Sequence, residues 1–222
     1  MQTSEIPTVQ AVIFDLDGTL ADTVGAIRDG INEAMRSLGY PEKSYDEVRH
    51  AIGNGAKLLV RRCMPPDAAE DEQRFARAFE AYERAYSVTY LNTRECYAGV
   101  VQTVKALYAR GIKLAVLSNK QDAFTKGLVG QLFPDGEFSV VWGQSSLPTK
   151  PDPTAPLLLC KGLGVAPCAC LFIGDSDVDM QTAQNAGMIG VGCAWGYRGR
   201  ASLEAAGARV VIDRPEQVLE LL

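Results

Sequence analysis

Six short apolar runs are spaced along the chain, and they are continuous rather than alternating. Continuous apolar runs are typical of parallel β-strands that are covered on both faces. Helical patterns separate the later runs, so the chain is predicted to form an α/β sheet with right-handed crossovers. The expected strands are residues 10–15, 112–118, 138–143, 169–174, 189–194 and 209–213. The expected helices among them are residues 99–111, 121–132, 153–163, 177–186 and 215–222.

Residues 23–90 differ from the rest because they contain no convincing strand. Two short helices are expected on either side of Gly53–Asn54–Gly55, and apolar side chains recur at helical spacing before and after them. An all-helical block inserted into an α/β sheet predicts a second, small domain. The two apolar helix faces are Ile27, Ile31, Met35 and Leu38, and Phe75, Phe79, Tyr82 and Tyr86, which we expect to form its core.

The composition narrows the class of protein. The 222 residues are 47% hydrophobic and 22% charged, as in ordinary globular proteins. A net charge of -5 argues against nucleic acid or an anionic membrane as the main partner. There is no apolar run of membrane-spanning length and no secretory pattern at the start. The six cysteines are therefore expected to be reduced thiols in a cytoplasmic protein, which we expect to be a monomer or a homodimer.

Chemistry-bearing residues follow four of the predicted strands. Asp15 and Asp17 lie at the end of the first strand, and Ser118–Asn119–Lys120 lie at the end of the second. Lys150 follows the third strand, and Asp175 and Asp179 follow the fourth. Open α/β sheets bind their ligands at the carboxyl ends of the strands. His50 is the only histidine, which excludes a zinc site built on several imidazoles. The chemistry is therefore expected to depend on carboxylates, hydroxyls and lysine.

The acidic residues at this edge call for a cation. In an extended segment side chains two apart point the same way, so Asp15 and Asp17 are expected to crowd one small volume. Together with Asp175 they favour a hard divalent cation with oxygen ligands, for which Mg²⁺ is the best fit. The cation leaves Asp15 ionised as a nucleophile toward phosphorus, and Asp17 is placed to donate and accept protons.

Three further residues belong to the predicted site. Ser118 offers a hydroxyl and Lys150 a positive charge to the phosphoryl oxygens during transfer. Gly18 allows the chain to turn tightly beside the site.

The motifs FDLDGTL, LSNK, KPDP and IGDSDVD, in this order, resemble those of the haloacid dehalogenase superfamily of aspartate-nucleophile phosphatases. The resemblance implies a three-layer, Rossmann-like core with a central parallel sheet and an inserted α-helical cap. It places the core at residues 1–21 and 96–222 and the cap at residues 22–95. It implies Asp15 as nucleophile and Asp17 as acid/base, with Mg²⁺ held by Asp15, the Asp17 backbone carbonyl and Asp175. It also implies phosphate contacts from Ser118 and Lys150, with Asp179 and Asn119 in support.

Within the superfamily, the segments AIGNGAKLLVRR and KPDPTAPLLLCKGLG are most similar to phosphoglycolate phosphatases. The resemblance implies a phosphoric monoester hydrolase whose small-molecule substrate is 2-phosphoglycolate. Contacts to the substrate are expected from Gly53, Asn54, Gly55 and Lys120. Arg61 and Arg62 either bind a substrate carboxylate or, as we favour, form a salt-bridged helix face.

Three alternatives remain open at this point. The same site serves a phosphosugar mutase similar to β-phosphoglucomutase, or a phosphatase of pyrophosphate or nucleotides. A different class is a regulatory protein that binds phosphate without catalysis.

Overall fold

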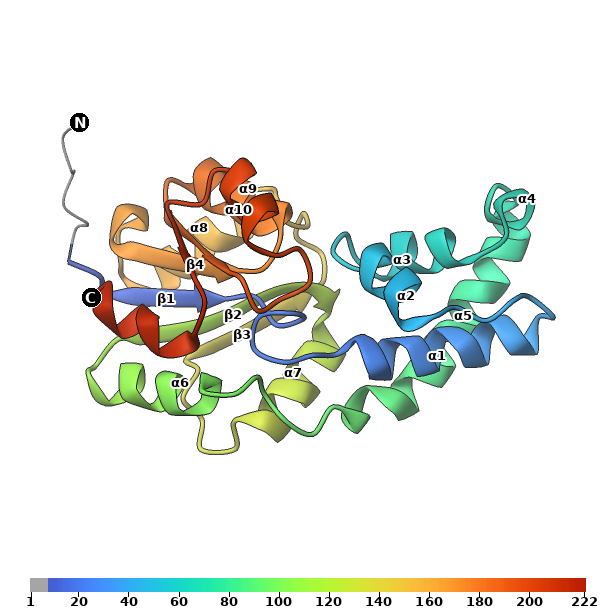
Figure 1. Cartoon of the computed structure of the whole chain (residues 1–222), viewed down its shortest axis with the longest axis horizontal. Helices are drawn as coiled ribbons and strands as arrows, with labels where there is room; N and C mark the ends of the chain where they lie inside the picture. The colour runs from blue at the N-terminus through green and yellow to red at the C-terminus, as the bar shows by residue number, and fades with distance from the viewer. Residues whose placement is uncertain (1–7) are drawn as a thin grey trace.

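The structure is a computed structural model that describes residues 8–222 of the chain (Figure 1). Its centre is a parallel sheet of six strands in the order β3-β2-β1-β4-β5-β6. The first strand therefore lies in the middle, between β2 and β4. The strands are β1 Ala11–Phe14, β2 Lys113–Gln121, β3 Val140–Gln144, β4 Cys170–Gly174, β5 Ile189–Cys193 and β6 Val210–Ile212.

Helices cover both faces of the sheet and so produce three layers (Figure 1). Alternate residues of β1 enter two different apolar clusters: Val12 and Phe14 pack toward α6 and α7, whereas Ala11 and Ile13 pack toward α8 and α9. This is why the central strands are apolar throughout. The helices of this part are α6 Val100–Ala109, α7 Asp122–Leu132, α8 Thr154–Leu163, α9 Asp177–Ala186 and α10 Arg200–Ala205, with 3₁₀ turns η2 Pro167–Ala169 and η3 Pro215–Glu220.

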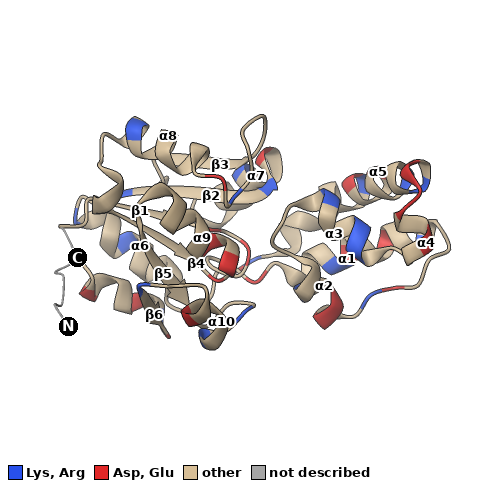
Figure 2. Ribbon diagram, turned by 90° about the horizontal axis from the view of Figure 1, so that it is seen from above, with Lys and Arg blue, Asp and Glu red and all other residues tan. Residues whose placement is uncertain are grey.

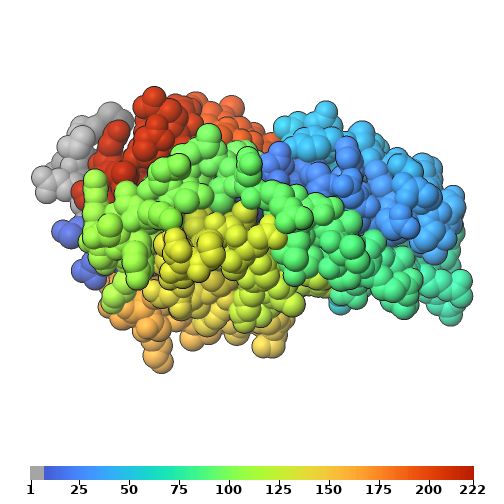
Figure 3. All heavy atoms as spheres, turned by 90° about the horizontal axis from the view of Figure 1, so that it is seen from below, coloured from blue at the N-terminus to red at the C-terminus, as the bar shows by residue number. Residues whose placement is uncertain are grey.

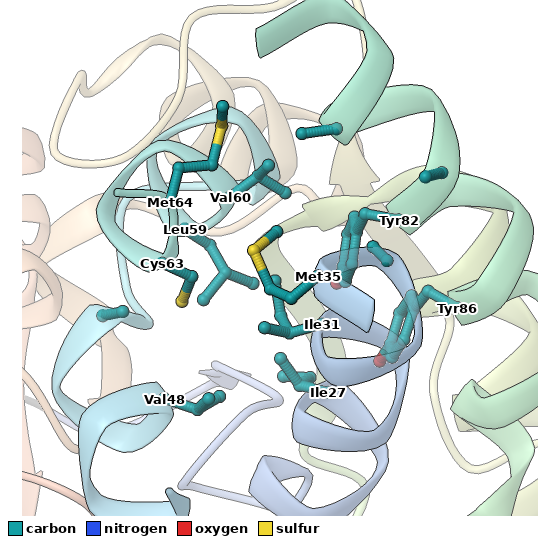
Figure 4. Packing of buried hydrophobic residues seen from close by; sticks show 14 of the residues in the cluster. Ile27, Ile31, Met35, Val48, Leu59, Val60, Cys63, Met64, Tyr82 and Tyr86 are labelled. Atoms are coloured by element: carbon teal, nitrogen blue, oxygen red, sulfur yellow. The ribbon is translucent and has the colours of Figure 1, made fainter. Parts of the chain in front are cut away.

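A separate helical unit follows β1. It consists of α1 Val24–Ser37, α2 Tyr45–Ala51, α3 Ala56–Cys63, α4 Pro66–Ala69, α5 Glu72–Thr89 and the 3₁₀ turn η1 Tyr90–Asn92. Its apolar side chains form a cluster of their own between α1, α3 and α5 (Figure 4). The chain enters and leaves this unit at one place, where the Tyr97 N–H donates to the Leu20 carbonyl at 3.0 Å.

The helical unit packs against the carboxyl edge of the sheet. From below, atoms of α5 and of the α7 region lie side by side (Figure 3). Phe124 of α7 contacts Tyr86 of α5 edge-on and Tyr90 of η1, with ring centroids 5.1 and 5.0 Å apart. The cavity described below is therefore bounded by both parts of the molecule.

The expected elements are present with three differences. Residues 215–220 form a 3₁₀ helix rather than an α-helix, α4 and α10 were not expected, and β2 continues through Lys120 to Gln121. The cysteines are free thiols, as expected. None of the helices within residues 8–222 is long and apolar enough to cross a membrane. The division into two domains stays a prediction, and its residues 1–7 lie outside the described part of the chain.

Candidate active site

The four strand-end motifs meet at one edge of the sheet, beside the helical unit. Asp15 follows β1, Ser118 lies in β2, Lys150 lies in the loop after β3, and Asp175 follows β4. All four side chains are buried and line one cavity. Seen from above, acidic segments gather at the junction between the sheet and the helical unit (Figure 2). The parallel order of the strands therefore brings together residues that are far apart in sequence.

Three carboxylates form a tight cluster in this cavity. Asp15, Asp175 and Asp179 each place one oxygen within 4.8 Å of the others. The Lys150 ammonium lies between two of them, 2.8 Å from Asp15 Oδ1 and 2.7 Å from Asp179 Oδ1. The Lys150 side chain is only 3% exposed, and its positive charge compensates part of the negative charge of the cluster.

One lysine does not neutralise three buried carboxylates. Burial raises the pKa of Asp15 from 3.8 to about 7 although Lys150 lowers it, and Asp179 and Asp17 raise it further. Burial also raises the pKa of Asp175 well above its usual range, and the charges of Asp179 and Asp15 add to that effect. An excess of oxygen donors and of negative charge in a small buried volume fits a hard divalent cation.

Gly18 and Asp179 fix the geometry of the cluster. Gly18 has a φ of +86°, and a Cβ there would lie 2.4 Å from Asp175 Oδ2, so the turn after β1 requires glycine. Asp179 accepts hydrogen bonds from Ser176 N at 3.1 Å and Ser176 Oγ at 2.6 Å, as part of the capping box that starts α9. Both residues border the acidic cluster, and their supporting role stays a prediction.

Asp17 has different partners from Asp15. Its carboxylate accepts from Lys120 Nζ at 2.8 Å and from Thr23 Oγ1 at 2.7 Å. Asp15 and Asp17 line the same cavity, and the charge of Asp17 raises the pKa of Asp15, but the Asp17 carboxylate does not belong to the cluster of three. The strand β1 ends at Phe14, and the two-residue alternation ends with it. The acidic cluster takes Asp179 in place of the Asp17 carboxylate.

Asn119 and Ser118 lie in β2, and both line the cavity. Asn119 accepts from the Lys150 N–H at 2.9 Å, and its Nδ2 donates to the carbonyls of Lys150 and Gly53, both at 3.1 Å. It thus orients the lysine backbone and holds the helical unit against the sheet. Ser118 Oγ accepts from the Lys120 N–H at 3.3 Å, at the wall of the cavity.

Comparison with known proteins agrees with this arrangement. The family model of haloacid dehalogenase-like hydrolases matches residues 12–192. The chain belongs to this family. The hydrolase is 36% identical over 210 residues to a phosphoglycolate phosphatase of Pseudomonas putida, covering 91% of this chain and 75% of the relative. It is 34% identical over 212 residues to phosphoglycolate phosphatase 1 of Pseudomonas aeruginosa, covering 94% and 78%.

A solved structure supports the same grouping. The crystal structure of a predicted phosphoglycolate phosphatase from Haemophilus somnus superimposes on the hydrolase with a TM-score of 0.90 and 30% identity. The match covers 97% of this chain and 99% of that one, so it includes the helical unit as well as the sheet.

The helical unit contributes fewer predicted site residues than the sheet. Gly53 and Gly55 line the cavity of the hydrolase, but Asn54 is not among its lining residues and instead accepts from Arg62 Nη2 at 3.0 Å. Arg61 pairs with Glu72 at 3.0 Å, outside the cavity lining. The helix-face interpretation of Arg61 is thus favoured, whereas Arg62 donates to Asn54 and to the Ala51 carbonyl.

A segment that the sequence analysis did not select, Trp195–Arg198, borders the site directly after β5. The Tyr197 N–H donates to Asp175 Oδ2 at 2.6 Å, and the Tyr197 hydroxyl accepts from the Thr23 N–H at 3.0 Å. Arg198 Nη2 donates to the Ile52 carbonyl of the helical unit at 2.6 Å. The available signal was its place after an apolar strand, the same signal that identified the other four motifs.

Proposed function

We propose that this hydrolase is a Mg²⁺-dependent phosphatase that cleaves a small phosphate monoester, 2-phosphoglycolate, through an aspartyl-phosphate intermediate on Asp15. The observation that carries the proposal is the buried cluster of Asp15, Asp175 and Asp179 around Lys150 Nζ. The names of the relatives, phosphoglycolate phosphatases, supply the substrate.

Asp15 is the nucleophile in this proposal. One of its carboxylate oxygens attacks phosphorus, the ester P–O bond breaks, and the leaving alkoxide departs on the opposite side. The Lys150 ammonium, 2.8 Å from Asp15 Oδ1, faces the charge on the phosphoryl oxygens, and the Ser118 hydroxyl supplies a further donor at the cavity wall.

Asp17 is the acid/base. It protonates the leaving alkoxide and then takes a proton from the water that attacks the aspartyl-phosphate, which releases inorganic phosphate and restores the Asp15 carboxylate. Its carboxylate is held for this role by Lys120 and Thr23, at 2.8 and 2.7 Å.

The donor set fits Mg²⁺. Asp15, Asp175 and the Asp17 backbone carbonyl would hold the ion, with Asp179 close enough to contribute. When bound, Mg²⁺ offsets the carboxylate charge and withdraws electron density from a phosphoryl oxygen. The raised pKa of Asp15, about 7, supports this assignment because burial, Asp179 and Asp17 together outweigh the opposing effect of Lys150.

The size of the cavity supports a small ester. Its volume is about 60 Å³. One water needs roughly 10–15 Å³ by this measure, so the cavity holds only about four to six waters. A space of this size favours a short leaving group over a nucleotide or a sugar bisphosphate. We propose residues 22–95 as a cap domain that closes over the substrate and excludes water.

Phosphate release from 2-phosphoglycolate tests the proposal. Purified protein with Mg²⁺ is expected to release phosphate steadily without a sugar acceptor, which a mutase does not do. Chelation of the metal is expected to stop the release, and Asp15→Asn is expected to abolish it. Turnover retained by Asp15→Asn would refute the nucleophile, and no turnover of any ester in a broad panel would favour a binding protein.

A further inference from the structure

Tyr86 lines the active-site cavity, and its hydroxyl group is buried without a partner. Tyr86 is 1% exposed, and its hydroxyl finds no hydrogen-bond partner among residues 8–222. The residue lines the cavity that contains Asp15 and Asp17. A buried hydroxyl without a partner destabilises the folded state, whereas phenylalanine in its place would remove that cost. A tyrosine at this position therefore points to a ligand.

The ring of Tyr86 is held rigidly. Tyr82 stacks on it with centroids 5.3 Å apart, and Phe124 from the sheet part meets it edge-on at 5.1 Å. On the other side α1 approaches closely because residue 30 is glycine; a Cβ there would lie 3.2 Å from Tyr86 Cδ2. The hydroxyl is thus preorganised, and little conformational freedom is lost when a ligand accepts from it.

The surroundings of Tyr86 define what it can bind. Lys120 Nζ lies 5.0 Å from the centre of its ring and also contacts Asp17, the proposed acid that serves the leaving group. Burial raises the pKa of Tyr86 well above 10, and the charge of Asp17 adds to this, so the hydroxyl stays a donor. A donor and a cation in the cavity that also holds Asp17, with an apolar wall that includes Ile27 and Leu59, suit a short leaving group with one anionic end.

We propose that Tyr86 is a specificity-determining residue whose hydroxyl donates a hydrogen bond to the carboxylate of the leaving group, with Lys120 supplying the neighbouring positive charge. The inference rests on the proposed phosphatase function and adds to it the group that distinguishes a carboxylate-bearing ester from a plain alkyl ester.

The test compares Tyr86→Phe with wild type on two esters of similar size, 2-phosphoglycolate and ethyl phosphate, which lacks the carboxylate. A hydrogen bond to a charged group predicts that kcat/KM for 2-phosphoglycolate falls by about tenfold to a hundredfold in Tyr86→Phe. The kcat/KM for ethyl phosphate is expected to stay unchanged. Tyr90→Phe is the matched control, because Tyr90 packs on Tyr86 without lining the cavity.

Thermal unfolding gives the second readout. Because Tyr86→Phe removes a buried hydroxyl without a partner, its Tm is expected to equal or exceed that of wild type. A lower Tm with an equal loss on both esters would show a structural role and overturn the proposal. A wild-type preference for 2-phosphoglycolate that survives in Tyr86→Phe would also overturn it. A wild-type protein that hydrolyses both esters without preference would instead contradict the substrate proposed above.

Discussion

Lys150→Met tests how the acidic cluster is stabilised when no metal is bound. The ammonium of Lys150 contacts Asp15 at 2.8 Å and Asp179 at 2.7 Å, and its side chain is 3% exposed. Methionine keeps most of the length of the side chain and removes the charge and its hydrogen-bond donors. The variant therefore leaves two buried carboxylates without their shared cation.

The expected loss depends on pH. Removing one partner of a buried ion pair typically costs about 3–5 kcal/mol, and we expect a loss of this size at about pH 8, where the carboxylates are charged. The Asp15 pKa is already raised to about 7, mainly by burial, and loss of Lys150, which lowers it, raises it further. A carboxyl group whose pKa is raised by folding stabilises the folded state. This stabilisation is fully present below about pH 3.8, the ordinary pKa, and is lost as the pH rises through the folded-state pKa of about 7. At about pH 5.5 Asp15 is protonated in the wild type as well as in the variant, because both pKa values lie above this pH. Lys150 then no longer pairs with a charged Asp15, so we expect the loss to fall to roughly half.

Urea unfolding in the presence of a chelator, at both pH values, measures this difference. Lys126→Met is the matched control: its ammonium pairs with Asp122 at 2.7 Å, but its side chain is 57% exposed, so a loss below about 0.5 kcal/mol is expected at both pH values. An equal loss for Lys150→Met at both pH values, or one no larger than the control, would refute the reasoning.

Two further predictions concern the cap and the metal. Arg198→Ala removes donors to the carbonyls of Ile52 and Arg49, so kcat/KM is expected to fall about tenfold, equally for 2-phosphoglycolate and ethyl phosphate. Arg200→Ala is the control, because it removes exposed contacts to Glu204, Asp213 and the Val211 carbonyl. An unequal fall for Arg198→Ala would indicate direct substrate contact instead. A cation must displace protons from Asp15 and Asp175, whose pKa values are both raised. The affinity for Mg²⁺, measured calorimetrically, is therefore expected to be at least about tenfold weaker at about pH 6 than at about pH 8, with more protons released at the lower pH. Equal affinities at the two pH values would contradict this.

The strands and the strand-end motifs were predictable from the sequence because each depends on a local signal. A continuous apolar run such as β4 identifies a strand covered on both faces, and a parallel sheet then places the residues after it at a common edge. The short helices α4 and α10 were not predicted, since four and six residues are too few to establish a helical period.

The side-chain partners were less predictable, because they depend on where each chain segment turns. Asp17 pairs with Lys120, a residue of another strand, and only the turn after Phe14 decides that it does not join the Asp15 cluster. The helical period correctly predicted that Tyr86 is buried, but a period does not identify the residues against which a side chain packs. Its place at the cavity follows from the packing of α5 on α7.

Chemical trapping at Asp15 tests the central claim most directly. Protein mixed with 2-phosphoglycolate and Mg²⁺ is quenched during turnover and treated with borohydride, which reduces an aspartyl-phosphate to homoserine, and the peptide that contains residues 11–21 is then analysed by mass spectrometry. The account predicts homoserine at position 15, dependent on both substrate and metal, with Asp17 unmodified. Steady turnover without modification of Asp15, or with modification at a different carboxylate, would contradict it.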